Sequence, residues 1–143
     1  MKWISPINLD AWGSTRTSET ELPGLVSDLI RATGPDINAM RFPTGEKGQV
    51  RGFDGTLDSS VAALNIPAGR SYWEFGTERD YQAKALRDFK KRNGEVSSPE
   101  RAASTLVLVT PFTWDSSRSD NKIEDWENAR KAESTWKDVM GIE

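Results

Sequence analysis

The sequence predicts an α/β fold, a three-layer sandwich in which helices flank a small mixed central sheet. Two observations indicate this fold class. Apolar residues recur at helical spacing between Leu22 and Ile30, and "TLVLVT" at 105–110 is a continuous run of branched apolar residues. Such a run is typical of a strand buried on both faces. The expected order is helix, three strands, helix, strand, helix and a final strand.

Length and composition indicate one domain, spanning residues 1–143. Hydrophobic residues make up 36% and charged residues 29%, no apolar run approaches the length of a membrane span, and the N-terminus lacks a signal-peptide core. We therefore expect a cytoplasmic protein with no membrane partner. The absence of cysteine fits a reducing compartment and excludes disulfides and thiolate metal sites.

The chain also contains no histidine, which excludes several kinds of chemistry. Serine and cysteine nucleophile systems that depend on histidine, ordinary zinc hydrolase sites and histidine acid/base catalysis are all ruled out. Chemistry must use carboxylates, Lys or Arg, hydroxyls, or a hard cation with oxygen ligands. The net charge of -3 gives no global attraction to nucleic acid, so a polyanion site requires local clustering of the 19 Lys and Arg residues.

The N-terminal elements are predicted from the glycine and proline residues that mark their ends. Residues 1–20 are expected to form an irregular arm anchored by Trp3 and Trp12. A helix follows over 21–33, with Pro23 near its start and Gly34 just past its end. Glycines and short apolar pairs then predict strands near 39–42 and 50–53, and a turn at Asp54 and the following glycine.

The C-terminal elements begin with "SYWEFG" at 71–76, a short aromatic strand. Thr77 and Asp80 resemble a capping box that opens a helix over 78–92. A polar connection leads to the buried strand at 105–110, and after a loop a helix is predicted over 123–139. The last residues, "DVMGIE", look like the start of another strand.

Two acidic residues stand where strands rarely carry them: Asp54 in "RGFDG" and Glu74 in "SYWEFG". Each has an ordinary interpretation, since Asp54 begins a standard turn pair and Glu74 would face solvent from an edge strand. Together, two carboxylates at adjacent strand ends can hold one hard divalent cation, Mg²⁺ or Mn²⁺. Such a cation activates water and neutralises phosphate charge, which supplies hydrolytic chemistry without histidine.

The same elements resemble a known family. A strand ending in "GFDG", a strand carrying Glu74, a helix and an apolar strand, all preceded by an amphipathic helix, resemble the PD-(D/E)XK nuclease superfamily and its α-β-β-β-α-β core. The segments "PAGRSYWEFGT", "KALRDFKKR", "LVLVTPFTW" and "WENARKAESTWKDV" resemble an N-terminal nuclease-like module of large multidomain bacterial proteins, some of the antiphage-defence type. The resemblance covers about residues 22–139. It implies a restriction-endonuclease-like fold in which Asp54 and Glu74 are the motif's acids.

The chain departs from the motif at its lysine, where Gly76 stands two residues after Glu74. The resemblance implies that a neighbouring helix supplies this lysine, and Lys84 is the candidate, although a solvated helix lysine is the alternative. Gln82 is expected to point more directly at the site. Glu21 is a further candidate metal ligand from the first helix, or it favours the helix N-terminus electrostatically.

Positive charge near the carboxylates marks a candidate nucleic-acid surface. A cluster of Lys and Arg follows Glu74 on the predicted helix, and acids at 78, 80 and 88 offer the alternative of a solvated, balanced face. The candidate nucleic-acid contacts are Arg51, Arg70, Arg79, Arg87 and Lys91.

Three functions remain open at this point. The first is a Mg²⁺-dependent endonuclease that hydrolyses DNA with little sequence specificity. The second is the same fold with an inactive site, kept for binding nucleic acid or protein, and the third is a purely structural domain. If the chain is the N-terminal module of a longer defence protein, C-terminal sensor or oligomerisation domains are the expected partners, and homo-oligomerisation is expected to control cleavage.

Overall fold

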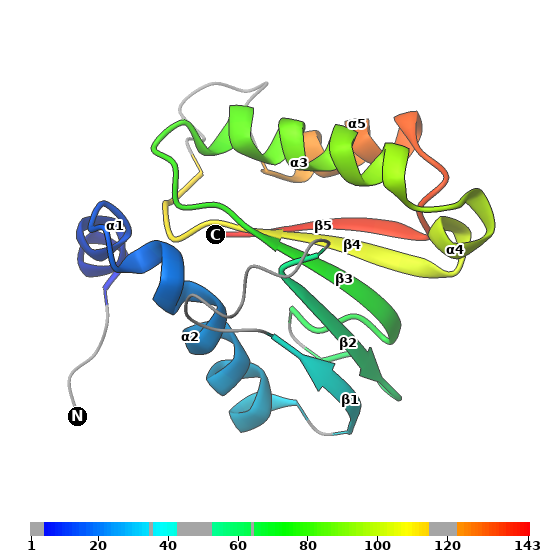
Figure 1. The fold of residues 1–143 in the computed structure, drawn as a ribbon, viewed down its shortest axis with the longest axis horizontal. Coiled ribbons are helices and arrows are strands. Elements are labelled where there is room, and N and C mark those ends of the chain that lie inside the picture. The colour runs from blue at the N-terminus through cyan, green and yellow to red at the C-terminus, as the bar shows by residue number, and fades with distance from the viewer. Residues whose placement is uncertain (1–4, 35, 43–52, 64, 115–122) are drawn as a thin grey trace.

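The computed structural model describes residues 5–34, 36–42, 53–63, 65–114 and 123–143. The chain forms a five-stranded mixed sheet with helices packed on it (Figure 1). The elements in chain order are α1 (Pro6–Gly13), α2 (Ser18–Thr33), β1 (Ile37–Arg41), β2 (Gly55–Ser59), β3 (Gly69–Phe75), α3 (Tyr81–Glu95), α4 (Ser98–Ala102), β4 (Ser104–Val109), α5 (Ile123–Glu133) and β5 (Asp138–Ile142).

The strands lie in the sheet in chain order, from β1 to β5. β1, β2 and β3 are antiparallel neighbours, whereas β3, β4 and β5 run parallel. β3 is therefore the central strand, paired on both sides. Its register places Trp73 opposite Gly55 of β2 and Glu74 beside Leu108 of β4.

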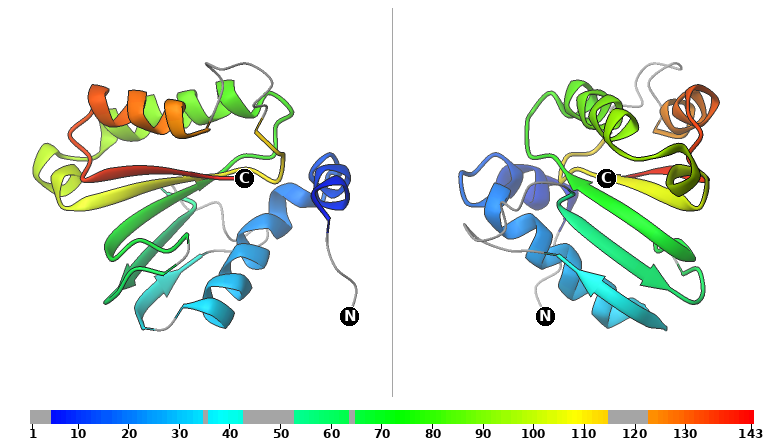
Figure 2. Two further views of the ribbon diagram at one scale, coloured as in Figure 1. Left: turned by 180° about the vertical axis from the view of Figure 1, so that it is seen from behind. Right: turned by 45° about the vertical axis from the view of Figure 1, so that its right-hand side comes forward.

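Helices cover both faces of the sheet, which confirms the predicted α/β sandwich (Figure 2). α3 and α5 lie on one face, where Phe89 packs with Tyr72 and Leu106, and α2 lies on the other, where Leu22 packs with Trp73. Successive residues of β3 thus face opposite layers. Tyr72 and Glu74 point toward α3, and Trp73 and Phe75 point toward α2.

The expectation of an irregular N-terminal arm was wrong, because residues 6–13 form α1. The Ser5 hydroxyl caps this helix by accepting a hydrogen bond from the Asn8 amide at 3.2 Å, and proline occupies the first turn, where its missing N–H is harmless. The buried Ser18 hydroxyl then donates to the Gly13 carbonyl at 2.9 Å and joins α1 to α2.

Three element boundaries also differ from expectation. Gly55 begins β2 instead of completing a turn, because it pairs with Trp73 and packs against the Phe42 ring, where a Cβ would come within 2.5 Å. The predicted strand at 50–53 falls largely outside the described residues. α3 starts at Tyr81 with Asp80 as its cap, and α5 ends at Glu133.

The other predicted elements are present: α2, β1, β3, β4 and the final strand β5. α4 is a short helix within the connection that was expected to be irregular. None of the helices in the described ranges is both long enough and apolar enough to cross a membrane.

Candidate active site

The two predicted acids meet at the end of β3. Asp54 immediately precedes β2, and the antiparallel pairing of β2 with β3 brings it beside Glu74. Its Oδ2 accepts a hydrogen bond from the Phe75 amide at 2.9 Å, and its carboxyl group is close enough to that of Glu74 to raise the pKa of Glu74. Two carboxyl groups from adjacent strands therefore form one pair, as the sequence predicted.

Glu74 does not face solvent from an edge strand, so that interpretation was wrong. β3 is the central strand, and Glu74 is 3% exposed. Its Oε1 accepts a hydrogen bond from Nε of Arg92, a buried side chain of α3 that also donates to Glu95 at 2.5 Å. The Arg92 guanidinium lies 4.6 Å from the Phe53 ring centroid. The buried acid is thus held between Asp54 and an internal cation.

The pKa of Glu74 is raised to about 8, mainly by burial and then by repulsion from Asp54, while Arg92 opposes the shift. The protonated form of Glu74 is therefore favoured at neutral pH. Any cation that binds both groups must displace this proton.

We expect Glu74 to make stability fall as pH rises. Its pKa is 4.5 in the unfolded chain and about 8 in the fold, so its contribution is complete below 4.5 and is lost as pH rises toward 8. In this window the free energy of unfolding falls by about 1.4 kcal/mol per pH unit from this group alone. Glu74→Gln, measured by urea unfolding in EDTA at several pH values, should flatten the decline.

The matched control is Glu95→Gln, which removes the other carboxylate bound to Arg92 but on a side chain that is 49% exposed. This variant should keep the wild-type pH dependence. Equal slopes for wild type and Glu74→Gln between pH 5 and 8 would contradict the raised pKa of Glu74.

Lys84 approaches the site over Gly76. A Cβ atom on Gly76 would lie 2.8 Å from Lys84 Cγ, so the lysine stem occupies the space that a side chain at 76 would need. Its Nζ lies 2.5 Å from Asp88 Oδ2, and the two side chains are 23% and 14% exposed. Lys84, for which a solvated helix lysine was the alternative interpretation, is therefore half-buried, and its stem lies against Gly76, where the motif's own lysine is missing.

Gln82, by contrast, lines neither cavity described next. The expectation that it points at the site more directly than Lys84 was wrong. Lys84, Asp88 and Arg92 instead form one stripe of α3, each four residues after the last. Sequence reasoning missed Asp88 and Arg92, although alternating charges at this spacing beside the apolar face were a usable signal.

Two cavities adjoin the stripe. A small one of about 20 Å³ lies between β3, α3 and α5 and is lined by Glu74, Lys84 and Asp88 among others. A cleft of about 710 Å³ opens between the α1–α2 turn and the end of the sheet. Its lining residues are Gly13, Ser14, Thr15, Arg16, Glu19, Thr20, Pro23, Asp54, Phe75, Thr77, Glu78, Arg79 and Lys84. Asp54 and Lys84 thus face a space large enough for a ligand.

The first helices bring a different acid to the cleft than predicted. Glu19 lines it, whereas Glu21 does not and instead accepts a hydrogen bond from Trp12 Nε1 at 3.4 Å. Arg51 lies outside the described residues. Arg70 is at the far end of β3 from Glu74, where it pairs with an aspartate.

Most of the predicted nucleic-acid contacts on and near α3 are already in ion pairs with acidic side chains. Arg87 pairs with Glu78 at 2.5 Å, and Arg79 with Asp10 at 3.0 Å. Lys91 is exposed on α3. The surface of α3 therefore carries much of its positive charge in internal ion pairs, as the balanced-face alternative predicted.

The carboxyl pair has donors suited to a hard cation. Mg²⁺ is commonly held by one or two carboxylates, with water and substrate phosphate completing its shell, so Asp54 and Glu74 fit this requirement. Among the residues that the structure describes, no group of three or more acids is placed to hold a metal. Arg92 competes for Glu74, which makes the internal ion pair the main opposition to metal binding.

Comparison with known proteins found no similar protein. No family model, no curated protein and no solved structure matches the chain.

Proposed function

We propose that the chain is a Mg²⁺-dependent endonuclease with a PD-(D/E)XK-like site that hydrolyses DNA phosphodiesters with little sequence specificity. One observation supports it most: the Asp54–Glu74 carboxyl pair lies beside Lys84, which enters over Gly76 and lines the same cleft as Asp54. This proximity supports the proposal, in which Lys84 of α3 would take the role of the motif's lysine.

Each residue has a role in this proposal. Asp54 and Glu74 would hold the cation, which supplies charge neutralisation and Lewis acidity at the phosphate when bound. Asp54 is fixed by the Phe75 amide and lines the cleft. Lys84 lines the same cleft with its ammonium paired to Asp88 at 2.5 Å, and it would stabilise negative charge that develops on the phosphate oxygens.

The test is cleavage of supercoiled plasmid by the purified chain at high concentration in Mg²⁺ or Mn²⁺, against EDTA, with calorimetry of metal binding in parallel. Cleavage that requires the metal supports the proposal. Absence of both binding and cleavage rejects it, and Asp54→Asn purified in the same way controls for contaminating nuclease.

A lysine transplant tests whether Lys84 replaces the missing motif lysine. Lys84→Ala should lower cleavage by about a hundredfold, since it removes one charged group from the site. The double variant Gly76→Lys, Lys84→Ala returns the amine to the motif's own position and frees the space it needs. Initial plasmid cleavage rates should recover at least about tenfold in the double variant.

Lys90→Ala is the control for this series, because that lysine is exposed on the same helix. It should cleave like wild type. A Lys84→Ala protein that is fully active would remove Lys84 from the proposed site.

A second function, an inactive nucleic-acid or protein binding module, is favoured by the Arg92–Glu74 pair. A buried guanidinium already neutralises the carboxylate that a metal would use. On this alternative the internal cation replaces the metal and the fold is kept for binding. It predicts no metal heat in calorimetry for the wild type.

A further inference from the structure

We propose that the cleft binds a single strand of nucleic acid, which leaves it over Arg16 and Arg41 on the α2–β1 side and not along α3. This inference rests on the proposed function for its choice of ligand. It adds the form of the substrate and the path that its backbone takes.

Three exposed arginines differ from the other described arginines in having no acidic partner among the residues that the structure describes. Most described arginines are paired with a carboxylate or bonded to backbone carbonyls. Arg16, Arg31 and Arg41 are exposed, and within the described ranges no carboxylate lies within ion-pair distance of them. They are therefore available to a polyanion, whereas Arg87 must first leave Glu78.

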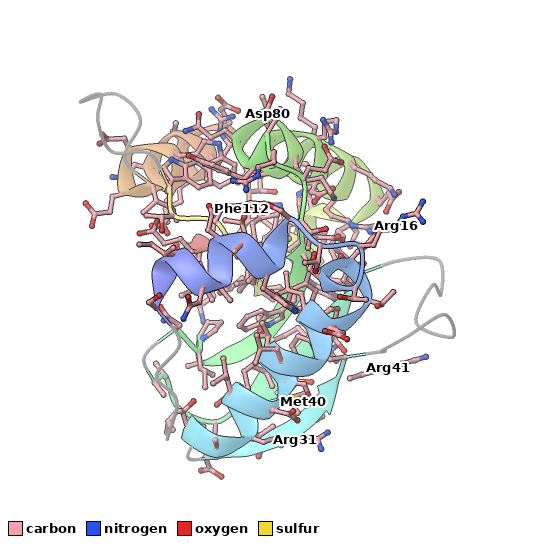
Figure 3. The ribbon with its side chains drawn as sticks, turned by 90° about the vertical axis from the view of Figure 1, so that its left-hand side faces the viewer. Arg16, Arg31, Met40, Arg41, Asp80 and Phe112 are labelled. Carbon is pink, nitrogen blue, oxygen red and sulfur yellow. The ribbon has the colours of Figure 1, made fainter. Side chains whose placement is uncertain are left out.

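These arginines lie on one side of the molecule. Figure 3 shows Arg16, Arg31 and Arg41 projecting in the same direction from the α1–α2 turn, the end of α2 and the end of β1. Arg16 also lines the cleft, and Arg41 is paired across the sheet with Thr56, two residues from Asp54. A backbone that passes the carboxyl pair can thus continue over both side chains.

The shape of the cleft favours one strand over two. Its volume of about 710 Å³ lies in the range of small-ligand pockets, whereas specific duplex recognition uses an open protein face of about 1,000 Å² or more. Its two walls are also tied together. Arg79 Nη1 donates to Asp10 at 3.0 Å and Nη2 donates to Ser14, while the guanidinium stacks on Phe112.

Thr77 adds a hydroxyl group to the lining. The hydroxyls of Ser14, Thr15 and Thr20 also line the cleft, but each already donates to a backbone carbonyl. Hydroxyls and arginines bind phosphate oxygens and sugars without reading bases. Glu19 and Glu78 are on the same lining and repel backbone phosphates unless a cation lies between them. Binding is therefore expected to be moderate, salt-dependent and independent of sequence.

The test is fluorescence anisotropy in EDTA with an oligothymidylate of about 20 nucleotides, against a blunt duplex of equal length. Arg16→Ala combined with Arg41→Ala should weaken single-strand binding about tenfold and lower the salt slope by about 1.4, the value for two lost phosphate contacts. Lys90→Ala combined with Lys137→Ala removes the same charge from exposed positions away from this path and should leave both quantities unchanged. Urea unfolding of each double variant checks folding, and Arg16→Lys combined with Arg41→Lys should bind like wild type.

If the two alanine pairs weaken single-strand binding equally, or if the first pair does not weaken it, the proposed path over Arg16 and Arg41 is wrong. Duplex binding as tight as single-strand binding overturns the form of the substrate, and no binding of either polymer overturns the whole inference. Because EDTA prevents metal-dependent cleavage, the outcome is separate from the nuclease proposal: single-strand binding without cleavage in Mg²⁺ leaves this inference standing and rejects catalysis.

Discussion

Asp54→Asn should lower metal-dependent plasmid cleavage by at least about a thousandfold, equivalent to about 4 kcal/mol of transition-state stabilisation. The amide keeps the shape of the side chain and can still accept the hydrogen bond from the Phe75 amide through its oxygen. It removes the negative charge that would hold the cation. Initial cleavage rates in Mg²⁺ and calorimetric metal titration measure the two consequences separately.

Asp58→Asn is the matched control, because this aspartate lies on β2, the strand that Asp54 precedes, and pairs with Arg70 at 3.0 Å on a partly exposed surface. It should cleave and bind metal like wild type. Asp54→Asn activity within threefold of wild type would reject the carboxyl pair as the metal site, and parallel loss in both variants would indicate a folding defect.

Arg92→Met should reduce the free energy of unfolding by about 3–5 kcal/mol, the range for removing one partner of a buried ion pair. Arg92 is 4% exposed, so the substitution leaves Glu74 buried without its cation and removes the contact with the Phe53 ring. Methionine retains most of the side-chain volume. Urea unfolding at pH 9 in EDTA, above the raised pKa of Glu74, where its carboxylate is ionised, measures the change.

A double-mutant cycle identifies the source of this loss. Glu74→Gln combined with Arg92→Met should recover part of the stability, because no buried acid is left without a partner. Arg130→Met is a control, since Arg130 contacts Glu133 at the end of α5 on the same face of the sheet. A loss below about 1 kcal/mol for Arg92→Met would show that the pair is not the anchor of this region.

The same variant separates the two proposed functions. If Arg92 occupies the place of a metal, Mn²⁺ should restore stability to Arg92→Met more than it stabilises wild type. If Arg92 instead orients Glu74 for a metal, the variant should lose metal binding along with stability. Thermal unfolding with and without Mn²⁺ distinguishes these results.

The sequence predicts a strand best where the strand is buried on both faces, because every position must then be apolar. The run at 105–110 is apolar on both faces and forms β4, whose Leu106 and Val107 are fully buried. β2 was misplaced because "GTLDS" carries a single large apolar residue, Leu57, and begins with a glycine that resembles a turn. That glycine is required by the Phe42 ring, a contact between residues distant in sequence.

The site follows the same rule. Asp54 and Glu74 could be paired from sequence because antiparallel strand ends meet at one edge of the sheet. Arg92 could not be assigned to Glu74, since that contact depends on the rotation of α3 about its axis. Gln82 was favoured over Lys84 because it shares the apolar helix face of Ala85 and Phe89, and the sequence does not show which edge of that face meets the site.

The charged stripe on α3 makes the charges around the carboxyl pair depend on where this helix lies. Lys84 and Arg92 are about 12 Å apart along one rigid helix, so neither can move without the other. A partner that pushes α3 along its axis would draw the ammonium away from Gly76 and the guanidinium away from Glu74 in the same step. A displacement of the helix would then change the positive charge that surrounds Asp54 and Glu74.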